Sequence, residues 1–368
     1  MTVLAIPPVL PQLHQTFAMS QAAVAALTSL PVLLFSFAAV PGSLLVSRFG
    51  PAHVMTAGIF LTAAAGAARG LSPDLAALFL TTFAMGFGIA IMQPALPAVV
   101  REWTPQRVAL GTAIYSNGLL VGEAFSASLT IPYVLPMAGG DWRTTLALWS
   151  VPVLVFGLLA AIETARRHEP RDPAAVPAKW WPDWRDPLTW RLGLLSGYAS
   201  SLYFGTNAFL PDYLAARGRP DLLNAALSSM NWVQIPASIL MVLFAPRLTL
   251  RRWPFLSLTT LSLAGVAALV VLPVETAAWW TGLLGFCNAF LLILTLALPP
   301  LIGTPGDVHR LSAAMIAIGY LSAFLVPLAG GALWDATGVP PSGFAPIVAF
   351  GLAALFLGAT LRFPRRTA

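Results

Sequence analysis

The stretch RVALGTAIYSNGLLVGEAFSASLTIPYVLP, residues 107–136, decides the fold. Nearly all of it is apolar, and a helix of this length, at ~1.5 Å per residue, exceeds the ~30 Å hydrocarbon core of a bilayer. One acid, Glu123, lies near its middle, ~24 Å of helix from Arg107 and ~20 Å from Pro136. A carboxylate at that depth is costly and usually belongs to a transport path or a proton relay. The stretch therefore predicts a transmembrane helix that carries a functional acid.

This predicted helix has two distinct stripes at ~100° per residue. The polar stripe consists of Thr112, Ser116, Glu123 and Thr130. The second stripe holds glycines, among which Gly118 and Gly122 have the spacing that suits close helix contact. We therefore expect one face to be directed to a lumen and another to pack against a neighbouring helix.

The composition of the whole chain excludes a soluble enzyme with a single anchor. The 368 residues are 58% hydrophobic and only 9% charged, whereas a soluble domain has ~25% charged residues. The net charge of +6 lies in short loops, where it sets orientation, so it does not indicate nucleic-acid binding. One cysteine, Cys287, and four widely separated histidines predict no disulfide, no metal site and no cofactor.

Hydrophobic runs predict an all-α membrane protein with twelve transmembrane helices in two pseudo-symmetric bundles. Residues 1–17 are too short to span comfortably, so we expect the first helix to be truncated at its N-terminus. The remaining spans are expected at 20–47, 52–68, 75–100, 108–137, 144–162, 192–211, 222–246, 253–274, 276–305, 311–334 and 339–361. The expected domains are a six-helix bundle at 1–163, a linker at 164–188 and a six-helix bundle at 189–368.

An internal repeat supports the division into two bundles. Gly86-Phe87 matches Gly285-Phe286 at an offset of 199 residues, and other short matches share offsets up to 202. Because the repeated unit has six helices, an even number, both copies should have the same orientation in the membrane.

The distribution of Arg and Lys predicts that orientation. One set of loops and ends holds 16 of the 20 basic residues. The other set holds Arg69, Arg143, Arg217 and Arg219. The positive-inside rule then places both termini and the linker in the cytoplasm.

Polar side chains on several expected spans can face one wet central cavity between the two bundles. Tyr203 and Asn207 share a helical face, and Asn231 lies near Trp232 and Gln234 on the next span. The residues expected to bind substrate are Gln93, Tyr115, Asn117, Tyr203, Asn207, Asn231, Trp232, Gln234, Asn288 and Tyr320. For any single amide or hydroxyl, an interhelical hydrogen bond remains the alternative.

The sequence contains none of the common catalytic motifs. It contains no Ser-His-Asp elbow, no HExxH motif and no phosphate-binding glycine loop. We therefore do not expect an enzyme.

Several motifs resemble the cyanate permease and nitroimidazole transporter family of the major facilitator superfamily. They are the run GIAIMQ at residues 88–93, the pair Tyr115-Ser116 and the run FLPDYL at residues 209–214. The resemblance covers essentially the whole chain. It implies a multi-pass protein of the bacterial inner membrane, acting as a monomer on a small-molecule substrate.

The superfamily's gating loop, G-x-x-x-D-R-x-G, is present only in part. Arg48 and Gly50 match it, but Ser47 stands where the family has an aspartate. The resemblance implies that Ser47, Arg48 and Gly50 form the gating loop, without the charge contact that the aspartate makes.

These observations favour a secondary active transporter that moves a small organic or inorganic anion, or a nitro-heterocycle-like compound, by alternating access. No Arg or Lys lies within the expected spans, so Glu123 has no cationic partner there and could bind and release a proton as the conformation changes. Protons and the lipid bilayer are therefore expected partners. An uncoupled facilitator and a drug-type efflux pump of the same fold remain alternatives. A membrane receptor or sensor also remains, although such a protein would more often carry a soluble signalling domain.

Overall fold

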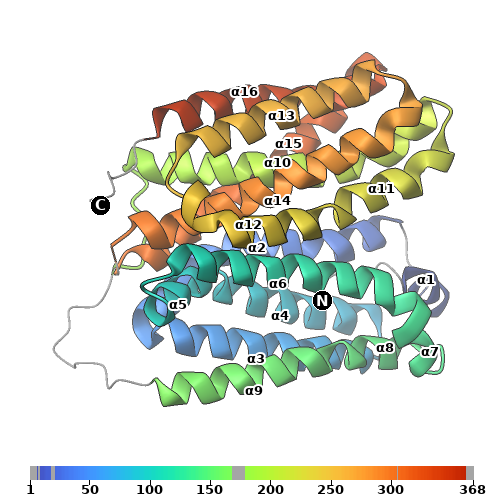
Figure 1. Ribbon diagram of the computed structural model, residues 1–368. Helices are drawn as coiled ribbons and strands as arrows, with labels where there is room; N and C mark the ends of the chain where they lie inside the picture. Colours follow the sequence, from blue (N-terminus) through green and yellow to red (C-terminus); the bar gives the residue numbers. More distant parts are fainter. Residues whose placement is uncertain (1–5, 7–8, 18–20, 168–178, 305, 362–368) are drawn as a thin grey trace. The chain divides into compact units, whose positions relative to one another are not determined.

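The computed structural model describes residues 6, 9–17, 21–167, 179–304 and 306–361, in which helices and turns occur but no β-strand (Figure 1). In chain order the elements are α1 (Leu10–Phe17), α2 (Gln21–Phe49), α3 (Pro51–Gly70), α4 (Leu75–Met92), α5 (Ala95–Trp103), α6 (Val108–Leu129), the π-helix η2 (Thr130–Val134), α7 (Leu135–Met137), α8 (Trp142–Leu148), α9 (Ser150–Arg166), α10 (Pro187–Ala216), η3 (Pro220–Leu222), α11 (Leu223–Trp232), α12 (Gln234–Leu248), α13 (Arg252–Val271), η4 (Val274–Thr276), α14 (Ala277–Ile302), α15 (Val308–Thr337), η5 (Pro340–Phe344) and α16 (Ala345–Thr360). The segment 1–17, where a truncated first helix is predicted, contains α1, while residues 1–5, 7 and 8 lie outside the described residues, so the truncation stays a prediction.

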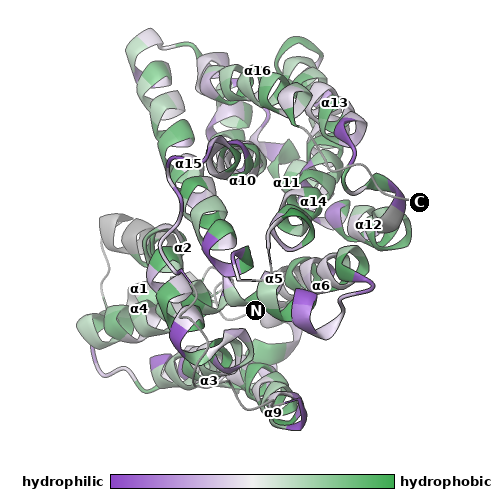
Figure 2. Cartoon of the chain, turned by 90° about the vertical axis from the view of Figure 1, so that its left-hand side faces the viewer, coloured by the Kyte–Doolittle hydropathy of each residue, from purple (hydrophilic) through white to green (hydrophobic). Residues whose placement is uncertain are grey.

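The expected all-α membrane architecture is confirmed. Within the described ranges, nine helical runs are long and apolar enough to cross a membrane. Hydrophobic residues make up most of the helices, and hydrophilic residues occur at several helix ends (Figure 2). Helix α10 has 30 residues but is not one of the nine. It carries the polar stripe that includes Tyr203 and Asn207, and these residues lower its hydropathy. The total of twelve spans stays a prediction.

Prolines interrupt four of the expected spans. Helix α8 ends at Leu148, four residues before Pro152, and α11 ends at Trp232, four residues before Pro236. Pro94 follows the end of α4, and Pro132 lies in η2. Proline has no backbone N–H, and its ring clashes with the carbonyl four residues earlier, so the α-helix ends or rearranges there.

Helix packing divides the chain into two compact units. Unit 1 comprises Met1–Val99, Val121–Pro182 and Pro305–Ala313, and unit 2 comprises Val100–Leu120, Asp183–Thr304 and Ala314–Ala368. The predicted bundles follow chain order, whereas the units follow contacts, so the boundaries at 163 and 189 stay a prediction. Helix α9 continues to Arg166, and most of the predicted linker, residues 168–178, lies outside the described residues.

Unit 1 is organised around α3 and α4. Helix α3 packs against α4, α8 and α9, and α2 packs against α4. An apolar core joins α1, α2, α4 and α8, with Trp149 beside them, and its buried members are Ile6, Val9, Leu13, Leu27, Leu78, Trp142, Leu146 and Trp149. At a nearby turn, the Arg143 guanidinium lies 4.5 Å from the Trp142 ring and donates a hydrogen bond to the Ser72 carbonyl.

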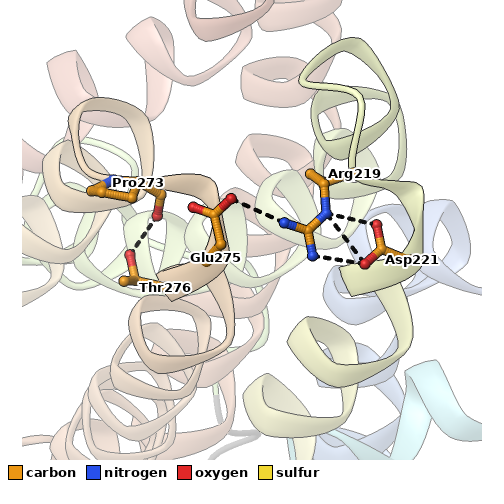
Figure 3. Close-up of polar contacts among 5 residues, drawn as sticks. All are labelled: Arg219, Asp221, Pro273, Glu275 and Thr276. Carbon is orange, nitrogen blue, oxygen red and sulfur yellow. Dashed lines mark hydrogen bonds and ion pairs between the residues drawn. The ribbon is translucent and has the colours of Figure 1, made fainter.

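Unit 2 is organised around α14, which packs against α10, α11, α12 and α13. The most apolar window of α14 is 78% buried, compared with 28–56% for the other candidate spans of the described chain. Two turns of this unit are joined by the Arg219 guanidinium, which bonds Asp221 at 2.8 Å and Glu275 at 2.9 Å (Figure 3). Glu275 belongs to η4, directly before α14, so this ion-pair group ties the turn after α10 to the start of the central helix.

Candidate substrate-binding site

The first part of the candidate site joins α10 to α11. The Tyr203 hydroxyl donates to the Asn231 side-chain oxygen at 2.8 Å, and the Asn231 amide donates to the Leu227 carbonyl at 2.9 Å. The Asn207 amide donates to the Tyr203 carbonyl at 2.8 Å and lies 3.7 Å from the Met230 sulfur. All three polar side chains are partly buried, so they form a hydrogen-bonded cluster between two neighbouring helices.

The second part joins α12 to α14. The Asn288 amide donates to the Gln234 side-chain oxygen at 3.1 Å, and these residues are 4% and 3% exposed. Gln234 is the first residue of α12, directly after the break at Val233. Pro236 has no N–H for the Trp232 carbonyl, so the break leaves a backbone acceptor beside the polar side chains. Interrupted helices of this kind supply backbone groups at the binding sites of transporters.

The third part brings α6 to α12. The Asn117 amide donates to the Ser238 hydroxyl at 2.7 Å, and that hydroxyl donates to the Ile235 carbonyl at 2.7 Å. Asn117 and Ser238 both belong to unit 2, although they lie 121 residues apart in the sequence. Unit 2 therefore combines a residue from the first half of the chain with residues of the second half.

Aromatic residues of the candidate site lie in the same unit. The Phe204 ring centroid is 5.3 Å from that of Tyr203 and 6.4 Å from that of Tyr320. Trp232 is 51% exposed, and Tyr115 is partly buried. Nine of the ten residues expected to bind substrate therefore lie in unit 2.

Two predicted functional residues lie in unit 1. Gln93 directly follows α4, at the break before Pro94. Glu123 lies in α6, but its side chain is outside the described residues. The prediction that these two residues share a cavity with the cluster in unit 2 stays a prediction.

The predicted gating loop is a one-residue connection between α2 and α3. Gly50 has φ +83°, which favours glycine, and its N–H donates to the Val46 carbonyl at 2.9 Å. Ser47 is buried and donates to the Leu44 carbonyl at 2.8 Å, whereas Arg48 is exposed. A serine carries no charge, so Ser47 cannot form the ion pair that an aspartate would form at this position. The gating role of this loop stays a prediction.

The expected faces of α6 are wrong in part. Gly118 was expected to pack closely, but it is exposed, and no atom lies within 4 Å of where its Cβ would be. Thr112, Ser116 and Thr130 were expected to face a lumen, but all three are fully buried. The Thr130 hydroxyl is satisfied in this position because it donates to the Ser126 carbonyl of its own helix.

The expectation for Arg69 is also wrong. Helix α3 continues to Gly70, so Arg69 lies in the helix and not in a loop. Its side chain is only 1% exposed and donates to the Met85 sulfur at 3.1 Å. Met85 lies ~15 Å along α4 from Leu75, so an arginine does reach membrane depth in unit 1. Ala65 and Gly66, which lie one helical turn before Arg69 on α3, are small and buried as well.

Three contacting residues are absent from the set that the sequence predicted to bind substrate. Ser238 and Met230 bond the predicted residues Asn117 and Asn207. Arg101 donates to the carbonyls of Pro300, at 2.6 Å, and Gly303, and so caps the end of α14. Pro236 signals the break beside Ser238, but partners that lie 121 to 202 residues apart have no local signal.

The side chains of the candidate site in unit 2 are uncharged. They are amides, hydroxyls and aromatic rings. Arg69 and His309, the basic side chains that are buried within the described ranges, belong to unit 1. Amide and phenol N–H and O–H groups can donate hydrogen bonds to an anion or a nitro group without a full positive charge. The arrangement suits recognition of a small acceptor-rich molecule.

Comparisons with known proteins agree with this architecture. The family model described as Major Facilitator Superfamily matches residues 1–284. The chain is 29% identical to the cyanate transport protein CynX of Escherichia coli (strain K12), over 98% of this chain and 94% of the relative. It is 28% identical to the 2-nitroimidazole transporter of the same organism, over 94% and 90%. A solved structure of the proton:xylose symporter XylE superposes with a TM-score of 0.75 at 13% identity, covering 98% of this chain and 92% of that chain.

The chain belongs to the major facilitator superfamily. It is a multi-pass membrane protein with the fold of that superfamily, whose members are transporters and not enzymes.

Proposed function

We propose that this protein is a secondary transporter of a small anion or a nitro-heterocycle, and that it works by alternating access. The observation that carries the proposal is the neutral cluster of Tyr203, Asn207, Asn231, Gln234 and Asn288 in unit 2. The names of two relatives, a cyanate transporter and a 2-nitroimidazole transporter, support this substrate class.

One neutral site can serve both kinds of substrate. Cyanate is a small anion with acceptor atoms at both ends, and 2-nitroimidazole offers nitro oxygens and a flat ring. Amide and phenol donors satisfy those acceptors, and the exposed ring of Trp232 offers a surface for stacking. A buried lysine or arginine at the site would instead favour the anion strongly over the neutral heterocycle.

Transport of radiolabelled cyanate and 2-nitroimidazole into proteoliposomes tests the proposal. We expect Asn231→Ala to raise KM about tenfold, since it removes a hydrogen-bonding partner worth ~1.4 kcal/mol. Asn224→Ala is the matched control, because Asn224 is an exposed amide at the start of the same helix. Equal KM values for both variants, or a parent protein that moves neither probe, would contradict the assignment.

We propose further that Glu123 couples transport to the proton gradient. An acid inside a predicted span can take up a proton in one conformation and release it in the other. Glu123→Gln keeps the hydrogen-bonding shape but cannot ionise, so it should exchange substrate across the membrane yet fail to accumulate it under an imposed pH gradient. If this variant accumulates substrate like the parent, Glu123 plays no part in coupling. If the parent itself does not respond to the pH gradient, the protein is an uncoupled facilitator.

We also propose that both termini and the linker are cytoplasmic and that the protein acts as a monomer in a bacterial inner membrane. The count of basic residues in the two sets of loops supports the orientation. Cysteine labelling from each side of the membrane, at single cysteines placed in the linker and at Gly139, would distinguish the two orientations once Cys287 is replaced.

A further inference from the structure

An apolar groove opens in unit 1 at the connection between α2 and α3. Its volume is about 610 Å³, and its walls come from α2, α3, α4 and α9. Leu45 and Phe49 form one wall, Ala57 lies on another, and Ala165 lies on a third. These four helices belong to the candidate membrane spans, so the groove lies where membrane lipid surrounds the protein.

The polar atoms that line the groove already have partners. The hydroxyls of Thr56 and Thr164 lie 3.1 Å apart, and Thr56 also donates to the Ala52 carbonyl at 2.9 Å. His53 is exposed. The walls therefore offer mainly hydrocarbon surface, which suits an alkyl chain better than a polar solute.

One end of the groove is basic. Arg48 comes three residues after the lining residue Leu45, and Arg167 comes three residues after the lining residue Thr164, so each lies one turn further along the same helix stripe. Arg166 is exposed beside them, and Glu163 forms an ion pair with Arg167. Figure 2 shows this end of α9 as hydrophilic. Among the described residues, three arginines against one glutamate give this end a positive charge.

We propose that the groove binds one anionic membrane phospholipid, with an acyl chain along the apolar walls and the headgroup phosphate against Arg48, Arg166 and Arg167. An alkyl chain gains little by moving from the bilayer into a protein groove, because both surroundings are apolar. Charge must therefore select the lipid, and basic pockets between transmembrane helices are suited to anionic headgroups. The phosphate would then contact Arg48 in the predicted gating loop, which makes this loop sensitive to the lipid.

Native mass spectrometry of the full chain in detergent, titrated with phosphatidylglycerol or phosphatidylcholine of the same acyl chains, tests the proposal. We expect the parent to bind phosphatidylglycerol at least tenfold more tightly. The double variant Arg166→Gln/Arg167→Gln should weaken that binding about 25-fold, since each arginine contributes roughly fivefold. Ala57→Phe, and as a second filling variant Ala165→Phe, should weaken it at least tenfold by occupying the groove.

Two matched controls lie in unit 2. Arg251→Gln/Arg252→Gln removes the same charge from an exposed pair at the start of α13, and Ala267→Phe adds the same ring to an exposed position of that helix. Both controls should bind lipid like the parent. A cooperative thermal unfolding transition shows which variants are folded. The proposal is overturned if the parent does not discriminate between the two lipids, or if the double arginine variant or the folded filling variants bind like the parent. It is also overturned if the controls lose as much affinity as the groove variants.

Discussion

The two units bury polar groups in different ways. In unit 2 the amides form pairs between helices, as Gln234 does with Asn288 and Asn117 does with Ser238. In unit 1 the buried Thr62 bonds the Gly58 carbonyl of its own helix at 2.7 Å, whereas helices are joined by the hydroxyl pair of Thr56 and Thr164 and by the contact of Arg69 with Met85. A pair between helices fixes two helices relative to one another and leaves further amide atoms for a ligand. A bond within one helix only satisfies the buried hydroxyl. The proposed recognition of substrate therefore rests on the amide side chains of unit 2, although polar side chains also pair between helices in unit 1.

The largest expected effect concerns the buried cation of unit 1. Arg69→Ala should lower the free energy of unfolding by about 4 kcal/mol, because it removes a long side chain from a closed interior and leaves a cavity. Arg69→Met fills most of that space with an apolar chain and should cost at most about 1 kcal/mol. Apparent melting temperatures in detergent and proteoliposome uptake measure both effects. Loss of uptake in a stable Arg69→Met protein would show that unit 1 also takes part in transport. It would contradict the proposal that substrate recognition rests on unit 2.

Equivalent glycines of the internal repeat give the next effect. A Cβ on Gly285 would lie 2.0 Å from the Met230 carbonyl oxygen, whereas a Cβ on Gly86 would lie 2.9 Å from a methyl carbon of Leu34. Backbone cannot move aside as a leucine side chain can, so Gly285→Ala should cost about 3 kcal/mol and Gly86→Ala about 1 kcal/mol. Thermal unfolding of the two variants compares them directly. Equal shifts would mean that the α11–α14 contact is no tighter than its counterpart in unit 1.

A smaller effect separates paired amides from local hydroxyl bonds. Gln234→Leu leaves the buried Asn288 amide without its acceptor and should cost about 2 kcal/mol. Thr62→Val removes a bond within one helix and should cost less than about 1 kcal/mol. The double variant Gln234→Leu/Asn288→Leu should recover part of the loss, which a double-mutant cycle in thermal unfolding measures. Strict additivity would show that the two amides do not act as a pair.

The smallest effects concern two arginines at turns. Arg143→Ala should cost about 1 kcal/mol, because the guanidinium stacks on Trp142 and bonds the Ser72 carbonyl. Arg219→Ala should leave the melting temperature unchanged within error, because exposed ion pairs such as those in Figure 3 are screened by water and salt. Melting curves at low and high salt distinguish the two. A salt-sensitive loss of stability in Arg219→Ala would assign a structural role to that ion-pair group.

Much of the architecture followed from local properties of the chain. The length of each apolar run predicts a membrane-spanning helix, because the bilayer core sets the length that a helix needs. The motifs at residues 88–93 and 209–214 carried the correct family. The amides Asn231, Gln234 and Asn288 stood out because polar groups are rare within apolar segments. Each of the three forms a hydrogen bond with a side chain on another helix.

Other features depended on neighbours that the local sequence does not contain. Pro152 and Pro236 end helices, yet Pro211 and Pro327 lie within continuous ones, because the surrounding helices decide whether a kink is tolerated. The sequence placed Arg69 in a loop because a charged residue ends the apolar run before it. Its burial depends on the contact with Met85 of α4, which the local sequence does not show.

The sequence by itself determined which family the chain belongs to and which segments are apolar and long enough to cross a membrane, since hydrophobic length and motif spacing are properties of single segments. Only the tertiary structure decided which face of each helix is covered. A soluble helix shows its buried face by its apolar stripe, but a membrane helix is apolar on all sides, so packing against other helices sets its rotation. For this reason the exposed Gly118, the buried Ser116 and the bond from Asn117 to Ser238 appeared only in the folded protein.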